Sequence, residues 1–174
     1  MTKDRTTTAN SGHLTKRMGT EQILNCNQSD FLQILSEIED FWGSDRTLHF
    51  HHPMFVNEFL NTSYVIKKDN KVLAYLFGFI SQTENTGYVH LVGVRQQFQR
   101  QGFGKKLYDF FITTLRQKNI SSLKAITTPT NSKSINFHIK MGMKMTGEQI
   151  DNGVKVIRNY SGYGQDRVIF QMEI

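Results

Sequence analysis

The chain has 174 residues, of which 38% are hydrophobic and 21% charged, and its formal net charge at pH 7 is +6. A single domain of this length buries a sizeable core, and no apolar run reaches the ~18 residues of a membrane-spanning helix. The composition therefore argues against a membrane protein. The single cysteine, Cys26, excludes an internal disulfide framework and favours a reducing compartment, so we expect a cytoplasmic protein.

Residues 1–18 form a polar, basic segment without hydrophobic periodicity. We predict a disordered tail over 1–18, since such a segment buries too little to offset the entropy of ordering, and one domain over 19–174. Four basic residues and one acid give the tail a charge of +3, which leaves +3 for the domain. That remainder suits an anionic ligand and does not require nucleic acid, because the basic residues are not interleaved with aromatic ones.

The first 80 residues predict a strand, two helices and a hairpin. Apolar residues at helical spacing follow a cap at Ser29 or Asp30, and Pro53 predicts the start of a shorter helix. Asp69-Asn70 predicts a tight hairpin turn. The expected elements are a strand over 21–26, helices from 29 or 30 to 42 and from 53 to 60, and strands over 63–67 and 72–80.

A strand–helix–strand unit follows in the centre of the chain. Tyr88–Val94 predicts a strand, and a helix begins at Gly102. One face of that helix carries apolar residues, namely Phe103, Leu107, Phe110, Phe111 and Leu115. With a strand over 122–127, the unit predicts two parallel strands joined by a crossover helix. Strands over 143–149 and 167–173, separated by a loop over 151–165, are expected to complete the sheet.

The polar loop between Val94 and the central helix predicts an anion site. It ends in Gly102 and Gly104, which let the backbone approach a phosphate, and the N–H groups of the first helical turn have no intrahelical partner. A dinucleotide-binding fingerprint is a poor match because its third glycine position is Leu107. A P-loop fails because Gln99 replaces its first glycine and Lys106 replaces its Ser or Thr.

The pattern Gln99-x-x-Gly102-x-Gly104 resembles the acyl-CoA loop of the GNAT family of N-acetyltransferases. A second segment agrees, because Asn131, Ser134, Phe137, His138 and Gly142 follow the family's order and spacing, with Met143 in place of the usual Phe. The resemblance extends over residues 63–149. It implies an α/β (α+β) domain in which helices flank a mixed, mostly antiparallel central sheet with one parallel βαβ unit.

The resemblance also implies an enzyme that transfers acetyl from acetyl-CoA directly to an amine in a ternary complex. The implied roles are that the loop amides hold the pyrophosphate, that Val92 and Val94 pair with the pantetheine through their main chain, and that the Val94 N–H faces the oxyanion. Asn131 either lies near the pantetheine or caps a helix, and these roles do not exclude each other. The implied cofactor-binding residues are Val92, Val94, Gln99, Arg100, Gln101, Gly102, Phe103, Gly104, Lys105 and Asn131.

Two histidines are candidate catalytic residues. His90 precedes Val94 by four residues, so strand alternation places it on the face of Val92 and Val94, where a neutral imidazole can act as base. The alternative is a packed or substrate-contacting histidine. His138 stands where the family commonly has the tyrosine that protonates the CoA thiolate, so it is the candidate acid or a cofactor contact. Weaker candidates for proton transfer are Tyr88, Glu84, Tyr160 and Tyr163.

The acceptor is less well defined than the cofactor. Trp42 and Arg46 lie where the family builds its acceptor pocket, and Arg46 either clamps a substrate carboxylate or forms a structural salt bridge. The run His49, His51 and His52 lacks a fourth ligand, so we expect no metal there but a loop-to-helix surface.

A small-molecule primary amine is the expected acceptor, because the loop at 150–165 is long enough to cover a small pocket. The alternatives are a protein Lys or N-terminus, or a non-catalytic acyl-CoA-binding module. The sequence does not decide between a monomer and a homodimer.

Overall fold

The computed structural model describes residues 21–149 and 153–174, so the predicted tail at 1–18 lies outside the described residues. The strands are β1 Gln22–Asn25, β2 Ser63–Lys68, β3 Lys71–Ile80, β4 Thr86–Val94, β5 Ser122–Thr127, β6 Lys144–Thr146, β7 Glu148–Gln149, β8 Lys155–Val156 and β9 Val168–Glu173. The helices are α1 Gln28–Ser36, α2 Ile38–Trp42, α3 Met54–Asn57, α4 Phe103–Gln117 and α5 Ser132–Lys140, with short 3-10 turns η1 Leu48–Phe50, η2 Leu60–Thr62 and η3 Gln96–Phe98. None of the described helices is long and apolar enough to cross a membrane.

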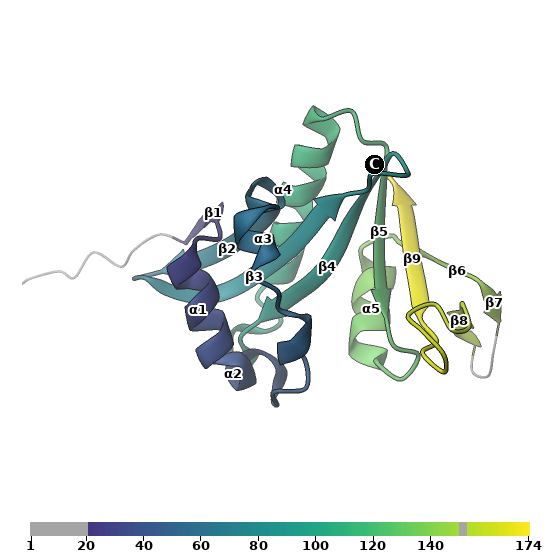
Figure 1. Ribbon diagram of the computed structural model, residues 1–174, viewed down its shortest axis with the longest axis horizontal. Helices are drawn as coiled ribbons and strands as arrows, with labels where there is room; N and C mark the ends of the chain where they lie inside the picture. Colours follow the sequence, from purple (N-terminus) through teal and green to yellow (C-terminus); the bar gives the residue numbers. More distant parts are fainter. Residues whose placement is uncertain (1–20, 150–152) are drawn as a thin grey trace, which may run out of the picture.

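A seven-stranded sheet in the order β1-β2-β3-β4-β5-β9-β6 forms the centre of the fold (Figure 1). Its strands pair antiparallel except β4 and β5, which are parallel. In the chain, α4 connects these two strands, and parallel strands require such a crossover connection. The predicted mixed sheet with one parallel βαβ unit is confirmed.

Separate hydrophobic clusters cover the two faces of the sheet. One contains residues of α1, α2 and α3, such as Ile34 and Phe55, packed against Tyr75 and Phe77 of β3. The other contains Leu107 and Phe111 of α4 and Ile135 of α5, packed against strand residues of the opposite parity. Because alternate side chains of a strand point to opposite faces, β3 contributes to both clusters at once.

Several local predictions need correction. Asn27, and not Ser29 or Asp30, caps α1, because its Oδ1 accepts the Asp30 N–H at 2.9 Å while Asp30 accepts the Asn27 N–H. Phe110 is 41% exposed and contacts the Tyr64 ring edge-on, so it is not on the core face of α4. The predicted strand 143–149 breaks at Gly147, which has a φ of 106°. A residue with a side chain would be strained at this φ, and its Cβ would collide with the Val156 carbonyl.

The predicted loop at 151–165 also differs from the structure. Its described part, from Gly153, contains the short strand β8, which pairs with β7 in a separate two-stranded sheet. Ile157 then bridges to Arg167, directly before β9. Cys26, predicted in a strand, directly follows β1 and is fully buried. The pairing of β7 with β8 and the bridge from Ile157 to Arg167 were not visible in the sequence, because such short pairings carry almost no periodicity.

A buried arginine ties the end of β4 to the first helices. Arg95 is fully buried, its Nε donates to the Val72 carbonyl at 2.5 Å, and its guanidinium pairs with Asp40 at 2.6 Å and with Glu37. The guanidinium also lies 4.6 Å from the centre of the Phe41 ring. These contacts fix where β4 ends and the glycine loop begins.

We predict that Arg95→Ala destabilises the fold by about 2–4 kcal/mol, because it leaves a cavity and an unpaired buried Val72 carbonyl. The carboxylates of Glu37 and Asp40 are partly exposed and regain water, so the ion pairs themselves add little. Urea unfolding measures the change. The control is Arg116→Ala, an exposed residue of α4, which should stay within about 0.5 kcal/mol of the unsubstituted protein. Equal stability of both variants would contradict the anchoring role.

Candidate active site

The separation of β4 from β5 creates the site. The two strands pair only where Thr86–Val89 lies beside Ser122–Ala125, yet β4 continues to Val94 and β5 to Thr127. The far edges of both segments remain paired, β4 with β3 and β5 with β9. Figure 1 shows the two strands meeting at one end and diverging toward the other. The facing edges beyond Val89 and Ala125 therefore offer backbone donors and acceptors without a strand partner.

The main-chain groups of Val92 and Val94 point into this gap. The Arg95 N–H donates to the Leu73 carbonyl of β3 at 3.0 Å. Because backbone groups alternate sides along a strand, the amides of Val94 and Val92 point away from β3 and toward β5. The Gln99 amide reaches the Val94 carbonyl at 3.3 Å, on this outer side. The contact of these groups with a pantetheine, which the family resemblance implies, stays a prediction.

The glycine loop leads from this edge into α4. Arg100 and Gly102 both have left-handed backbones, with φ values of 64° and 85°, and α4 begins at Phe103 without a side-chain cap. The first amides of α4 are therefore free for an anion. Phe103 is buried, so only its backbone is available, whereas four other residues of the predicted pyrophosphate loop are exposed, namely Gln99, Arg100, Gln101 and Lys105.

Gly104 and Asn131 lie on the two sides of the gap. A Cβ on Gly104 would approach the Phe137 ring of α5 to 3.3 Å, so α5 packs closely beside the loop. Asn131 caps α5, because its Oδ1 accepts the Ser134 N–H at 3.1 Å. The structure thus shows the capping role of Asn131, and the contact with a pantetheine remains a prediction.

A β-bulge changes the position of His90. Phe77 pairs with Leu91 and Gly78 pairs with Val89, which leaves His90 as an extra residue in β4. The imidazole consequently stacks on Phe55, on the face of α3, at 4.8 Å between ring centres. Val92 and Val94 pack against the opposite cluster. The prediction that His90 shares their face is therefore wrong, because the bulge reverses the alternation.

His90 keeps a geometry suited to a base. Its Nε2 lies 3.0 Å from the Phe50 carbonyl, which can only accept, so Nε2 carries the proton and Nδ1 holds the lone pair. Burial lowers the pKa of His90 below 6.5, with a smaller opposing contribution from the Phe50 carbonyl. The imidazole is therefore neutral at pH 7, with a nitrogen available to take a proton.

His138 has surroundings that disfavour a proton-donating role. It is 3% exposed, stacks on Phe170 at 4.5 Å, and places Nδ1 2.8 Å from the Ser134 carbonyl. Its Nε2 accepts the hydroxyl of Tyr108 at 2.7 Å. Burial lowers the pKa of His138 to about 4, so the imidazole is neutral at pH 7. Sequence reasoning did not find Tyr108, since its helical position predicts only core packing.

A hydrogen-bonded aromatic network beneath β4 contains Trp42, an expected substrate residue, and His51. The Trp42 indole donates to the Tyr75 hydroxyl at 2.7 Å, and that hydroxyl lies 2.6 Å from His51 Nε2. His51 is buried, and burial lowers its pKa, so it does not belong to the surface that we expected for the histidine run. The Tyr75 ring fills the space where a Cβ on Gly93 would stand. Trp42 thus supports β4, while its contact with a substrate remains a prediction.

Burial and ion pairing distinguish the remaining candidates for substrate binding and proton transfer. Arg46 is exposed, and no carboxylate of the described residues pairs with it. Glu84 pairs with Lys124 at 2.7 Å, and burial raises the pKa of Tyr88, so both are poor bases. Burial also raises the pKa of the Cys26 thiol to about 12, which leaves it protonated and unsuited to nucleophilic attack.

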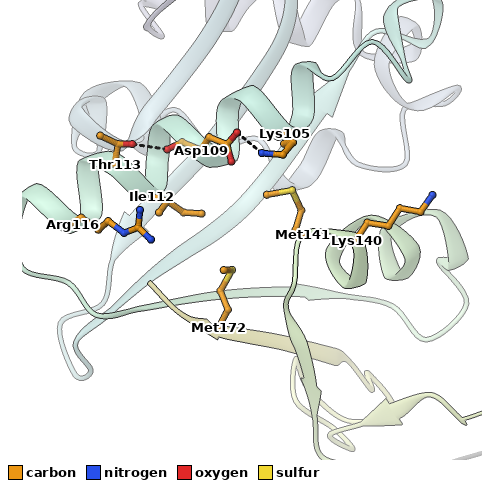
Figure 2. A pocket seen from close by; sticks show the side chains of 8 residues that line it. All are labelled: Lys105, Asp109, Ile112, Thr113, Arg116, Lys140, Met141 and Met172. Carbon is orange, nitrogen blue, oxygen red and sulfur yellow. Dashed lines mark hydrogen bonds and ion pairs between the residues drawn. The ribbon is translucent and has the colours of Figure 1, made fainter.

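A groove of about 410 Å³ runs along α4, between this helix, the end of α5 and β9 (Figure 2). Lys105 and Arg116 mark its ends on α4, Lys140 stands at the end of α5, and Met141 and Met172 give it apolar walls. The α4 residues that line the groove recur at helical spacing, and this spacing is a signal present in the sequence. They are Lys105, Asp109, Ile112, Thr113 and Arg116. The residues that face them on α5 and β9 have no such signal in the sequence.

Comparison with known proteins decides the family. A model described as the acetyltransferase (GNAT) family matches residues 29–143, more than half of the chain. The chain belongs to the GNAT family. No curated protein sequence matches it significantly.

Solved structures of GNAT proteins share the fold. A putative GNAT-family acetyltransferase from Desulfovibrio desulfuricans has a TM-score of 0.72 at 17% identity, covering 88% of this chain and 99% of that chain. The ribosomal-protein-S18-alanine N-acetyltransferase of Escherichia coli gives 0.63 at 16%, covering 89% and 94%. The PaiA N-acetyltransferase of Thermoplasma acidophilum, solved with coenzyme A, gives 0.65 at 13%, covering 89% and 99%.

In this GNAT protein, buried His138 predicts a loss of stability in mild acid. Its folded pKa of about 4 lies below the ordinary value of 6.5, so the unfolded chain binds the proton first as pH falls. The free energy of unfolding should fall by up to about 3 kcal/mol between pH 6.5 and 4 and be insensitive to this group above that window. Urea unfolding across that range, with His138→Gln as the non-titrating comparison, measures the difference. Identical pH dependence in both proteins would refute a neutral buried imidazole.

Proposed function

We propose that the protein is a cytoplasmic acetyl-CoA-dependent N-acetyltransferase that acetylates the primary amine of a small molecule by direct transfer. One observation carries the proposal: the unpaired edge of β4, with the amides of Val92 and Val94, leads directly into the uncapped helix start behind Gly102 and Gly104. An extended amide chain that ends in a pyrophosphate matches both parts.

The cofactor would lie along this path from sulfur to adenosine. The pantetheine pairs with Val92 and Val94, and the pyrophosphate meets the amides from Arg100 to Lys105. The groove that begins at Lys105 then accepts the adenosine end. Lys140 and Arg116 supply positive charge there, while Asp109 is neutralised by Lys105 at 2.7 Å.

Transfer would proceed without an acyl-enzyme. The amine, deprotonated by Nδ1 of His90, attacks the thioester carbonyl, and the Val94 N–H donates to the oxyanion that forms. Collapse of this intermediate breaks the carbon–sulfur bond and releases the CoA thiolate. Because His138 is neutral with both ring nitrogens engaged, we assign protonation of the thiolate to water that reaches the open gap.

Two classes of acceptor remain, a small molecule and a protein. Arg46 is exposed without an ion pair among the described residues, which suits the carboxylate of a small acceptor beside Trp42. A protein N-terminus or Lys is the alternative, and one fold relative is an acetyltransferase of ribosomal protein S18. Release of CoA thiol with an amine library and with peptide libraries separates them. CoA binding without any release would favour the non-catalytic module.

We predict that Gly104→Asp weakens CoA binding at least tenfold, or ~1.4 kcal/mol. The new carboxylate repels the pyrophosphate at the helix start, and its Cβ also crowds Phe137. Calorimetric titration with CoA gives the dissociation constant. Gln117→Glu adds the same charge at the far end of α4 and should leave affinity within about twofold. Unchanged affinity in Gly104→Asp would exclude the loop as the pyrophosphate site.

We also predict that His90→Gln lowers kcat/KM by roughly 10²–10⁴ while CoA still binds. Since the pKa of His90 is lowered, the acidic limb of the wild-type pH–rate profile should lie below pH 6.5, and the variant should lose it. His49→Gln changes a neighbouring exposed histidine and serves as the control. A variant that keeps both rate and acidic limb would return His90 to a packing role.

A further inference from the structure

The two halves of the cofactor site are held apart by different strands. The glycine loop and α4 follow β4, whereas Asn131 and α5 follow β5. Beyond Val89 and Ala125, no backbone pairing joins these strands. The width of the gap at its open end therefore depends on contacts between α4 and α5.

Tyr108 and His138 make the polar contact between those helices. Tyr108 on α4 is fully buried and its hydroxyl lies 2.7 Å from Nε2 of His138 on α5. In the described part of the chain, this is the one side-chain hydrogen bond that joins the two helices. The Tyr108 ring also meets the Phe137 ring edge-on at 5.3 Å, and Phe137 in turn borders Gly104.

The direction of this hydrogen bond is fixed. The Ser134 carbonyl, 2.8 Å from Nδ1 of His138, can only accept, so Nδ1 carries the ring proton. Nε2 then holds a lone pair, and the Tyr108 hydroxyl must donate to it. Both groups lie away from water, where losing either partner leaves the other unsatisfied. The geometry is thus specific to one arrangement of α4 against α5.

We propose that Tyr108 and His138 are positioning residues that set the spacing between the glycine loop and α5, and thereby the affinity for the cofactor. The inference rests on the proposed function. It assigns His138 a role different from that of the tyrosine which the family resemblance places there. The pair affects the binding of CoA, and neither residue donates or accepts a proton during the reaction.

Tyr108→Phe tests the pair by removing one hydroxyl. We expect it to raise the CoA dissociation constant and the KM for acetyl-CoA at least ~threefold, with kcat within about twofold and the alkaline limb of the pH–rate profile unchanged. Tyr64→Phe is the matched control. It removes a hydroxyl that bonds Thr114 of α4 and Asn61 but does not reach α5, and it should leave CoA affinity unchanged.

A second pair of variants guards against general misfolding. His138→Gln keeps an acceptor for the Tyr108 hydroxyl and should bind CoA more tightly than His138→Leu. Equal CoA affinity in Tyr108→Phe and the unsubstituted protein would overturn the inference, as would equal losses in the Tyr108 and Tyr64 variants. A fall in kcat with a flattened alkaline limb would overturn it in favour of proton donation. An unsubstituted protein that fails to bind CoA would instead refute the proposed function itself.

Discussion

The local absence of pairing between two neighbouring parallel strands governs the rest of the structure. β4 and β5 are held together over Thr86–Val89 and Ser122–Ala125, and each then follows its own outer partner. Leaving backbone groups unpaired inside a sheet is costly unless a ligand or water satisfies them. A ligand with its own amides would resolve that cost, so the separation supports the proposed position of the cofactor along β4 and its extended form.

The surrounding contacts hold the two strands in that position. Arg95 anchors the end of β4 to α2 and to the junction between α1 and α2. The Tyr75 hydroxyl, hydrogen-bonded to Trp42 and His51, supports the strand beneath Gly93. On the other face, α4 and α5 meet through Tyr108 and His138. These buried polar side chains, on the two faces of the sheet, are each hydrogen-bonded, as the low dielectric of a core requires. Rigid support of this kind suits a site that must hold a thioester within reach of an amine.

Hydrogen bonding distinguishes the two candidate histidines. The Nδ1 atom of His90 has no hydrogen-bond partner among the described residues, and the neutral imidazole is the form that a base needs. His138 is also neutral, but Ser134 and Tyr108 occupy both of its nitrogens. The same lowering of pKa therefore suits one residue to proton transfer and the other to a structural hydrogen bond. The number of free nitrogens, more than the pKa, distinguishes them.

The sequence by itself determined the family, the order of the main elements and the glycine loop, because these depend on short-range patterns of glycine, apolar spacing and caps. Only the tertiary structure decided the face of His90, since a bulge depends on the register of β3 against β4, which no periodicity within β4 encodes. It alone also paired Tyr108 with His138, brought Lys140 opposite Lys105, and buried His51. Those contacts join residues distant in the chain, and their geometry exists only once the sheet has brought α4 and α5 together.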